Sequence, residues 1–432
     1  MYKNNYALSF LILFFALSTG LNTVHALSVD ELRQQIEAKQ KEKAALEAQN
    51  LLLQKQIEET SKQANTLQNT VKSLDTTQKK LQNDLKVTET KISSTALTIQ
   101  KLSLEISDTQ KKIEQRKSAI AEIMRSLQDT ENGTTLEAFL KYNKVSELWD
   151  NVETLKRFQE ALRQNSIELG NLKKEYDDKK NENVEKKQQL TGLKEELSDK
   201  KTIVEQNKNA KTALLVQTKS KETLYKEQLA KNIELGKKFE QELFDFENQL
   251  KIAIDPSKLP SQRIGVLSWP LDSITITQRF GKTVDSKRLY VSGTHNGVDF
   301  KASVGTPVKA VLGGIVKGTG NTDDQAGCYS YGRWVLIEHP NGLSSLYAHL
   351  SQSRVSQGQS ISTGEVLGYS GGQPGVFGSG YSTGPHLHLG LYASQGVEVK
   401  QYTQSLFCKK VFIPVASANA YLDPLAYLPA LP

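Results

Sequence analysis

The chain has 432 residues, more than one ordinary hydrophobic core accommodates, so we expect at least two structural regions. Its formal net charge is +7, but lysines alternate with acidic residues along the first half, so the sequence contains no concentrated basic patch for nucleic acid. All 11 prolines lie at Pro256 or later, and most of the 28 glycines follow Gly236. This uneven distribution predicts a helical first half and a β-rich second half.

Residues 1–26 have the features of a secretory signal peptide. Lys3 provides the positive charge, residues 7–21 are largely apolar, and small residues precede the expected cleavage site after Ala26. We therefore expect an exported protein of the cell envelope, periplasmic or extracellular, that is not an integral membrane protein after cleavage. The alternative is an uncleaved anchor, although the apolar run is shorter than the ~20 residues of a membrane span.

Residues 27–253 are predicted to form a long antiparallel coiled-coil hairpin. From Ala64 to Leu127, mostly apolar residues recur at an alternating spacing of three and four, which is typical of a left-handed coiled coil. Asn132-Gly133 is a turn signal, and we expect a second long helix from about 152 to 250. Such long helices need a partner in water, and an intermolecular coiled coil is the alternative to the hairpin.

The expected tip of the hairpin, near 130–150, is more apolar than a turn between helices requires. It concentrates large side chains, namely Leu136, Phe139, Leu140, Leu148 and Trp149. A cluster of exposed apolar groups usually marks a binding surface, so we expect the tip to bind a partner. The alternative is that these residues fold back and cap the hairpin.

Residues 254–264 contain two prolines and predict a linker, and a second domain is expected over 265–432. Four of the chain's six histidines fall in three motifs of this domain: Gly293-Thr-His295-Asn-Gly-Val-Asp299, Tyr347-Ala-His349-Leu and Gly384-Pro-His386-Leu-His388. On strands, His295 and Asp299 would share a face, as would His386 and His388.

These residue types suit a catalytic zinc ion, which uses three protein ligands and keeps a fourth position open. His295, Asp299 and either His386 or His388 would fill such a site, which leaves two histidines for proton transfer and oxyanion stabilisation. The alternative is a set of buried strand histidines that only satisfy backbone carbonyls.

The three motifs, in this order, resemble those of the lysostaphin-like zinc metallopeptidases, also called LytM domains, over roughly residues 266–428. The resemblance implies a compact antiparallel β-sheet domain, and hence an α + β multidomain chain. It implies one Zn²⁺ per chain, bound by His295, Asp299 and His388, with His349 and His386 as catalytic residues. It also implies hydrolysis of stem or cross-bridge peptides in peptidoglycan.

A signal peptide, a coiled-coil hairpin and a C-terminal LytM domain together look like cell-division murein hydrolases and amidase activators. This resemblance implies that an envelope or division-complex protein binds the coiled coil. Some of those activators have lost their zinc ligands, whereas every motif position is filled in this chain. The sequence therefore favours a zinc metalloendopeptidase. The alternatives are a non-catalytic activator of a cell-wall amidase and a structural coiled coil with an inert cap.

Two loops, residues 321–333 and 377–383, are candidates for the walls of a substrate groove. Tyr329, Tyr331 and Tyr381 in these loops are the candidate substrate-binding residues. Cys328 and Cys408 are the only cysteines of an exported chain, so we expect them to form a disulfide, the alternative being two free thiols.

Overall fold

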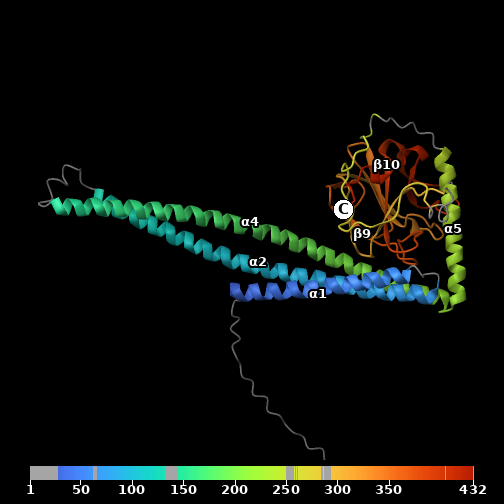
Figure 1. The fold of residues 1–432 in the computed structure, drawn as a ribbon, viewed down its shortest axis with the longest axis horizontal. Coiled ribbons are helices and arrows are strands. Elements are labelled where there is room, and N and C mark those ends of the chain that lie inside the picture. Colours follow the sequence, from blue (N-terminus) through green and yellow to red (C-terminus); the bar gives the residue numbers. More distant parts are fainter. Residues whose placement is uncertain are drawn as a thin grey trace, which may run out of the picture. The chain divides into compact units, whose positions relative to one another are not determined.

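The computed structural model describes residues 28–61, 66–131, 145–249, 257, 259, 261–283, 286, 293–403 and 405–431. These residues form long helices followed by antiparallel β-sheets, which confirms the predicted α + β class (Figure 1). They divide into two compact units, one within residues 1–36 and 97–183 and the other within 37–96 and 184–432. The expected signal peptide, most of the expected tip and part of the expected linker lie outside the described residues.

The helices occupy the part of the chain that lacks proline. Their bounds are α1 Val29–Ser61, α2 Leu67–Glu131, α4 Val145–Thr218 and α5 Glu222–Gln249. At the start of α1, the Ser28 Oγ accepts a hydrogen bond from the Glu31 N–H (3.2 Å), and the Glu31 Oε2 accepts one from the Ser28 N–H (2.8 Å). This reciprocal capping box satisfies two donors that helix geometry leaves unpaired. No helix among the described residues has the length and apolar character to cross a membrane.

Helices α2 and α4 pair in antiparallel orientation in both units. In one unit, the Arg116 Nη2 donates to the Glu168 Oε1 (2.7 Å), and in the other, the Asn207 Nδ2 donates to the backbone oxygen of Leu74 (3.1 Å). Residue numbers therefore rise along α2 as they fall along α4. These contacts within one chain are those of the expected antiparallel hairpin.

The prediction of one unbroken helix from about 152 to 250 is wrong, because the chain turns between α4 and α5. Lys219 and Ser220 adopt φ values of 49° and 57°, in the left-handed region that side chains disfavour. The Ser220 N–H donates to the Leu215 oxygen (3.1 Å), so the turn caps the end of α4. Neither residue is a glycine, so the sequence gives no ordinary signal for this break.

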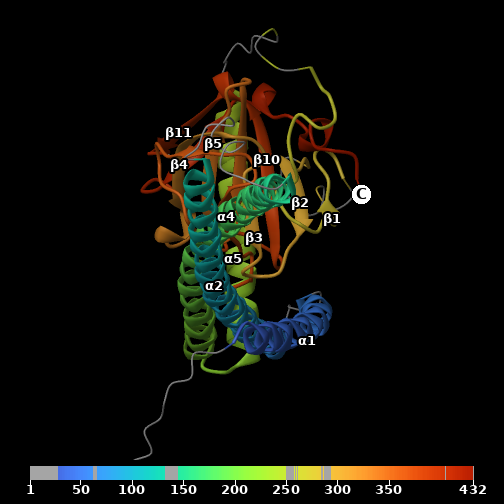
Figure 2. The same ribbon diagram turned by 90° about the vertical axis from the view of Figure 1, so that its left-hand side faces the viewer.

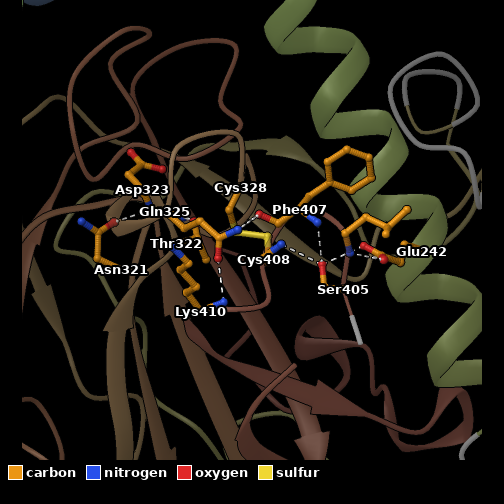
Figure 3. Close-up of a disulfide and its surroundings, with 12 residues drawn as sticks. Glu242, Asn321, Thr322, Asp323, Gln325, Cys328, Ser405, Phe407, Cys408 and Lys410 are labelled. Atoms are coloured by element: carbon orange, nitrogen blue, oxygen red, sulfur yellow. Dashed lines mark hydrogen bonds between the residues drawn. A yellow bond between two sulfur atoms is a disulfide. The ribbon is translucent and has the colours of Figure 1, made fainter. Parts of the chain in front are cut away.

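Helix α5 packs against the β-sheet region of its unit. Phe239 and Leu243 lie in a buried cluster with Ile413 and Val415 of β12. The carboxylate of Glu242 accepts hydrogen bonds from the Ser405 Oγ (2.8 Å) and the Leu406 N–H (2.6 Å). Figure 3 shows Glu242 of α5 beside Ser405. The domain boundary expected after residue 253 assigns α5 to the coiled-coil hairpin, whereas in the structure this helix packs on the β-sheets.

Among the described residues, all strand pairs are antiparallel, and the largest sheet has seven strands in the order β1-β2-β10-β6-β5-β4-β8. A second sheet has the order β3-β9-β7, and β11 pairs with β12. Figure 2 labels β1, β2, β10, β5 and β4 of the largest sheet. The strand bounds are β1 Ile276–Gln278, β2 Gly297–Lys301, β3 Pro307–Lys309, β4 Gly314–Asn321, β5 Arg333–Glu338, β6 Leu343–Ala348, β7 Leu350–Ser353, β8 Ser360–Ile361, β9 Val366–Ser370, β10 His386–Ala393, β11 Val397–Gln401 and β12 Phe412–Ala416. Short 3₁₀-helices are η2 Thr322–Asp324, η3 Ser394–Gly396, η4 Ala418–Ala420 and η5 Pro424–Ala426.

Alternating side chains of the central strands form the main core of this region. Val298, Phe300, Leu387, Leu389 and Leu391 of β2 and β10 belong to one buried apolar cluster. The residues between them on these strands, including His386, His388 and Asp299, point to the opposite face. Because the apolar residues of β2 and β10 pack into the core on one face of the sheet, the polar motif residues lie together on the opposite face.

Candidate metal centre

The candidate site forms where three neighbouring strands of the large sheet meet. In the pairing of β2 with β10, Asp299 lies opposite His388, and in the pairing of β10 with β6, His388 lies opposite Ala348. His349 follows β6 directly, and His295 precedes β2 in an isolated bridge with Gly281. Strand register thus brings together residues that are up to 93 positions apart in sequence.

Three ligand atoms face one another in this site. The Asp299 Oδ1 lies 2.9 Å from the His388 Nδ1 and 3.3 Å from the His295 Nε2, and the two imidazole nitrogens are 3.2 Å apart. Their residues are almost fully buried, with exposed fractions of 0% for His295, 7% for Asp299 and 4% for His388. Among the residues that the structure describes, this is the one group of three that satisfies the spacing of a metal site.

The spacing of these atoms fits a tetrahedral zinc ion. Zinc–nitrogen and zinc–oxygen bonds of ~2.0–2.1 Å in tetrahedral geometry place neighbouring ligand atoms about 3.3 Å apart. The His295 Nδ1 lies 3.1 Å from the Arg279 carbonyl oxygen, which can only accept, so this nitrogen carries the proton and the Nε2 keeps its lone pair. The three atoms therefore have the spacing of a metal site, and His295 can offer the lone pair of its Nε2 to the ion.

Gly297 gives the His388 ring the space that it occupies. A Cβ atom at residue 297 would lie 2.6 Å from the Cε1 and 2.7 Å from the Nε2 of His388. Any side chain at this position would therefore displace the imidazole. The glycine of the first motif is explained by the close approach of the second strand, not by backbone conformation.

The surroundings of Asp299 favour its ionised carboxylate, and those of His388 favour its neutral imidazole. Burial would by itself raise the pKa of Asp299, but nearby His386 and hydrogen bonds with His295 and His388 together lower that pKa well below its ordinary value. Burial lowers the pKa of His388, more than its contact with Asp299 raises it. A metal ligand must be deprotonated, and both groups are biased toward that form.

His349 and His386 lie beside the three ligand residues, with their ring centres 4.7 Å apart. The His349 Nδ1 donates to the Ser379 carbonyl (2.8 Å), and the His386 Nδ1 donates to the Gly384 carbonyl (2.7 Å). In each neutral ring, the Nε2 is therefore left as a proton acceptor. The His386 Nε2 lies 3.8 Å from the Asp299 Oδ1, so it faces the three ligand atoms.

His349 has an unusual backbone conformation, with φ of 58°. This region costs about 1–3 kcal/mol for a residue other than glycine and persists where surrounding contacts hold it. The His349 N–H donates to the Tyr331 oxygen (2.9 Å), and its own carbonyl accepts from the Gly371 N–H (2.8 Å). These bonds on both sides place the imidazole next to the candidate metal site. Burial lowers the pKa of His349 well below its usual value, which also favours the neutral base.

Residues 293–401, which carry this entire constellation, match peptidase family M23. This segment is a peptidase family M23 domain. The chain is 34% identical over 134 residues to the DD-carboxypeptidase/endopeptidase Mpg of Neisseria meningitidis, a match that covers 31% of this chain and 28% of that protein. It is 36% identical over 128 residues to the peptidoglycan DD-endopeptidase ShyA of Vibrio cholerae, covering 28% and 26% respectively.

Lysostaphin from Staphylococcus staphylolyticus is 38% identical to the M23 domain region over 100 residues, or 22% of this chain and 18% of that protein. Each of these three matches spans less than a third of the relative's length. Among solved structures, the catalytic domain of lysostaphin from Staphylococcus simulans aligns at 26% identity over 35% of this chain and 89% of that chain, with a TM-score of 0.25. The M23 family is zinc-dependent, and the His295–Asp299–His388 group is the candidate metal site of this domain.

The three candidate substrate tyrosines have different environments in the M23 domain. Tyr329 is half-buried, whereas Tyr331 is buried in an apolar cluster and its hydroxyl accepts from the Asn296 Nδ2 (3.2 Å). Tyr381 packs against α5, since a Cβ atom at Gly236 would lie 2.9 Å from its ring. Substrate contact remains a prediction for all three, and Tyr381 would meet a substrate only beside α5.

Cys328 and Cys408 are joined by a disulfide, which connects the loop before β5 to the segment before β12 (Figure 3). Both residues are buried, with 1% and 0% exposed, in the cluster that contains Phe239 and Leu243 of α5. The Gln325 side chain reinforces the connection, because its Nε2 donates to the Phe407 oxygen (2.5 Å). The inserted loop is therefore fixed at its base.

The sequence does not reveal the groups that orient the histidines of the candidate site. The carbonyls of Arg279, Ser379 and Gly384 accept hydrogen bonds from His295, His349 and His386, respectively. Backbone carbonyls carry no residue-type signal, so no motif could have identified them. Gly297 was visible inside the first motif, but its contact with His388 depends on strand pairing.

Proposed function

We propose that this chain is an exported zinc-dependent endopeptidase that cleaves stem or cross-bridge peptides of peptidoglycan in the cell envelope. The observation that carries the proposal is the convergence of three ligand atoms, 2.9–3.3 Å apart, beside two further histidines whose Nε2 atoms are proton acceptors. Two relatives support the substrate class, because ShyA is named a peptidoglycan DD-endopeptidase and Mpg a DD-carboxypeptidase/endopeptidase. Zinc, one ion per chain, would supply Lewis acidity at the scissile carbonyl.

The protein residues divide the remaining work. His295, Asp299 and His388 would hold the ion, and a three-ligand catalytic site keeps its fourth position for water or substrate. His349 and His386, which lie beside these ligands with Nε2 atoms able to accept protons, would transfer protons and stabilise charge on the substrate oxygen. Complete ligation favours an enzyme over the alternative, a non-catalytic activator of an amidase.

The test uses the full chain and measures metal content together with digestion of purified peptidoglycan. We expect one zinc per chain and soluble fragments whose mass spectra reveal new peptide termini. Asp299→Ala is the matched control and should lose both properties. A zinc-loaded protein that releases no fragments by itself, but increases release by an added amidase, would replace the endopeptidase proposal with the activator function.

Helix α5 suggests how access to the site is controlled. A cavity of about 220 Å³ lies between α5 and the M23 domain, lined by Glu240, Leu243, Phe244 and Glu247 on α5 and by Phe280, Thr294, Asn296, Ala418 and Tyr421 on the domain. Thr294 and Asn296 flank the ligand His295 in sequence. A partner that binds the helical region would alter access to the candidate metal site by moving α5. Trp149, near the expected tip, is 69% exposed and is a candidate contact for that partner.

A further inference from the structure

Asp323, on the inserted loop before β5, binds the backbone on both sides of the residue that orients His349. Its Oδ2 accepts hydrogen bonds from the N–H of Gly378 (2.7 Å) and the N–H of Gly380 (3.1 Å). Ser379, between these two glycines, accepts from the His349 Nδ1 through its carbonyl (2.8 Å). One carboxylate therefore holds the segment that contacts the candidate catalytic histidine.

The glycine segment is closely packed, so its position depends on what holds it. Gly378 and Gly380 have φ values of 95° and 58°, which glycine adopts without strain. A Cβ atom at Gly380 would lie 2.1 Å from the Ser330 oxygen, and the Tyr381 N–H donates to that same oxygen (2.8 Å). The Ser379 carbonyl thus sits on a segment that fits tightly against the loop carrying Asp323.

Asp323 is the charged group among the hydrogen-bond partners of this segment. A carboxylate that accepts from backbone N–H groups forms stronger bonds than a neutral acceptor. The neighbouring Asp324 is exposed and instead accepts from the Asn321 Nδ2 (3.0 Å), away from the glycines. Figure 3 labels Asn321 and Asp323 on the turn that leads to Cys328, so the disulfide fixes the same loop at its far end.

The hydrogen bond to the Ser379 carbonyl decides which nitrogen of His349 is protonated. A carbonyl oxygen only accepts, so the neutral imidazole must carry its proton on Nδ1 and keep its lone pair on Nε2. If the carbonyl moved away, the ring would lose this preference. The position of Ser379 therefore affects whether His349 can act as a base through Nε2.

We propose that Asp323 is a positioning residue for His349: its carboxylate holds the Gly378–Gly380 segment so that the Ser379 carbonyl fixes the Nδ1–H tautomer of the imidazole. This role rests on the proposed function of His349 in peptide hydrolysis. Asp323 acts through the backbone and does not itself touch the reacting atoms.

The test compares Asp323→Ala with Asp324→Ala in the full-length, zinc-loaded chain. Nitrogen NMR of ¹⁵N-histidine-labelled protein distinguishes protonated from unprotonated ring nitrogens, and His349→Gln assigns the signal. We expect Asp323→Ala to lose the single Nδ1–H tautomer of His349 and to lower kcat for peptidoglycan hydrolysis by about tenfold or more, with KM and zinc content unchanged. Asp324→Ala, which removes the same charge from the same turn, should change neither measurement.

Two conservative variants separate positioning from loss of folding. Asp323→Asn retains an acceptor oxygen and should restore the tautomer and most of kcat. Asp323→Glu keeps the charge but moves it by one methylene, so it should lower kcat while the melting temperature stays close to that of wild type. An unchanged tautomer in Asp323→Ala, or equal effects of Asp323→Ala and Asp324→Ala, would overturn the proposal. If wild type releases no fragments but Asp323→Ala still changes the tautomer, the proposed function fails while the positioning role stands.

Discussion

The paired helices and the M23 domain both bury polar residues, but these residues serve different purposes. Between α2 and α4, the Lys200 Nζ donates to the Thr88 Oγ1 (2.9 Å), and the Asn207 side chain donates to the backbone of Leu74. Such bonds repeat along a regular seam and fix its register. In the M23 domain, His295, Asp299 and His388 come from separate segments and meet at one point.

The comparison shows where a polar residue is replaceable. Along the repeating seam between α2 and α4, many positions contribute to register and stability. One substitution there should therefore have a modest effect on both. In the candidate metal site, each residue supplies a different ligand atom, so no neighbouring residue replaces the function that its substitution removes. Substitutions of site residues in the M23 domain should therefore have different effects on bound zinc and on hydrolysis, depending on the role of each residue.

The largest expected effect separates the two histidine roles in the site. His388→Ala should sharply reduce bound zinc, because two protein ligands remain. His349→Ala should keep zinc but lose hydrolysis by ~10²- to 10⁴-fold, because proton transfer is removed. Metal analysis and fragment release measure these outcomes. Zinc loss in His349→Ala with zinc retention in His388→Ala would reverse the assignment.

His339 provides the matched control for that experiment. It is buried in the same domain, where its Nε2 lies 2.8 Å from the Ser345 Oγ and its Nδ1 lies 3.1 Å from the Gly313 oxygen. His339→Gln should affect stability but leave zinc content unchanged. A loss of zinc in this variant would mean that any buried histidine change unfolds the site.

The next effect concerns the Cys328–Cys408 disulfide, which has no counterpart in the paired helices. It closes a loop with a sequence separation of 80 residues, and cross-links of that length stabilise by about 4 kcal/mol in the chain-entropy model. Cys328→Ser with Cys408→Ser should therefore lower the melting temperature of the M23 domain while the helical circular dichroism signal of the hairpin persists. Thiol titration of the unfolded, unreduced wild type should find no free thiols, and two free thiols per chain would contradict the bond.

Helix α5 connects the two regions in sequence, and its release should activate the site. Leu243→Glu places a charge in the buried cluster with Cys408 and Ile413 and should weaken α5 packing. We expect this full-length variant, like the isolated segment 261–432, to digest peptidoglycan ~5- to 150-fold faster than wild type at equal zinc occupancy. If wild type without a partner is as active as both, α5 is a structural support and not an inhibitor.

The smallest effect is pH-dependent and involves Glu247 on α5. Its Oε1 accepts from the Tyr421 hydroxyl (2.7 Å) and the Ala416 N–H (3.2 Å), and burial raises its pKa from the ordinary 4.5 to about 7. Between these values the folded state binds more protons than the unfolded state, so the contribution of Glu247 to stability falls as pH rises from about 4.5 to 7.

Glu247→Gln keeps an acceptor oxygen but removes the buried charge. The variant should match wild type near pH 4.5 and exceed it by about 3 kcal/mol at pH 8, where the wild-type carboxylate is ionised. The difference in melting temperature between variant and wild type, measured at both pH values, tests this expectation. A difference that does not change with pH would show that Glu247 stays neutral or exposed.

The sequence by itself determined the regular parts of this protein and the identity of its reactive residues. The absence of proline before Pro256, with the repeating apolar spacing, was enough to predict the long helices, because helix formation depends on near neighbours. The three motifs identified His295, Asp299, His349, His386 and His388, because few residue types can bind zinc and move protons. From residues alone, however, the choice between His386 and His388 as the third ligand stayed open.

Only the tertiary structure decided how these residues combine. The register of β2 against β10 puts His388, not His386, opposite Asp299, and no local pattern specifies which of two alternate residues faces a distant strand. The break at Lys219 and Ser220 and the packing of α5 were equally hidden, since no glycine or proline marks that turn. Asp323 reaches His349 only through a backbone segment more than 50 residues away, a contact that exists because folding brings two loops together.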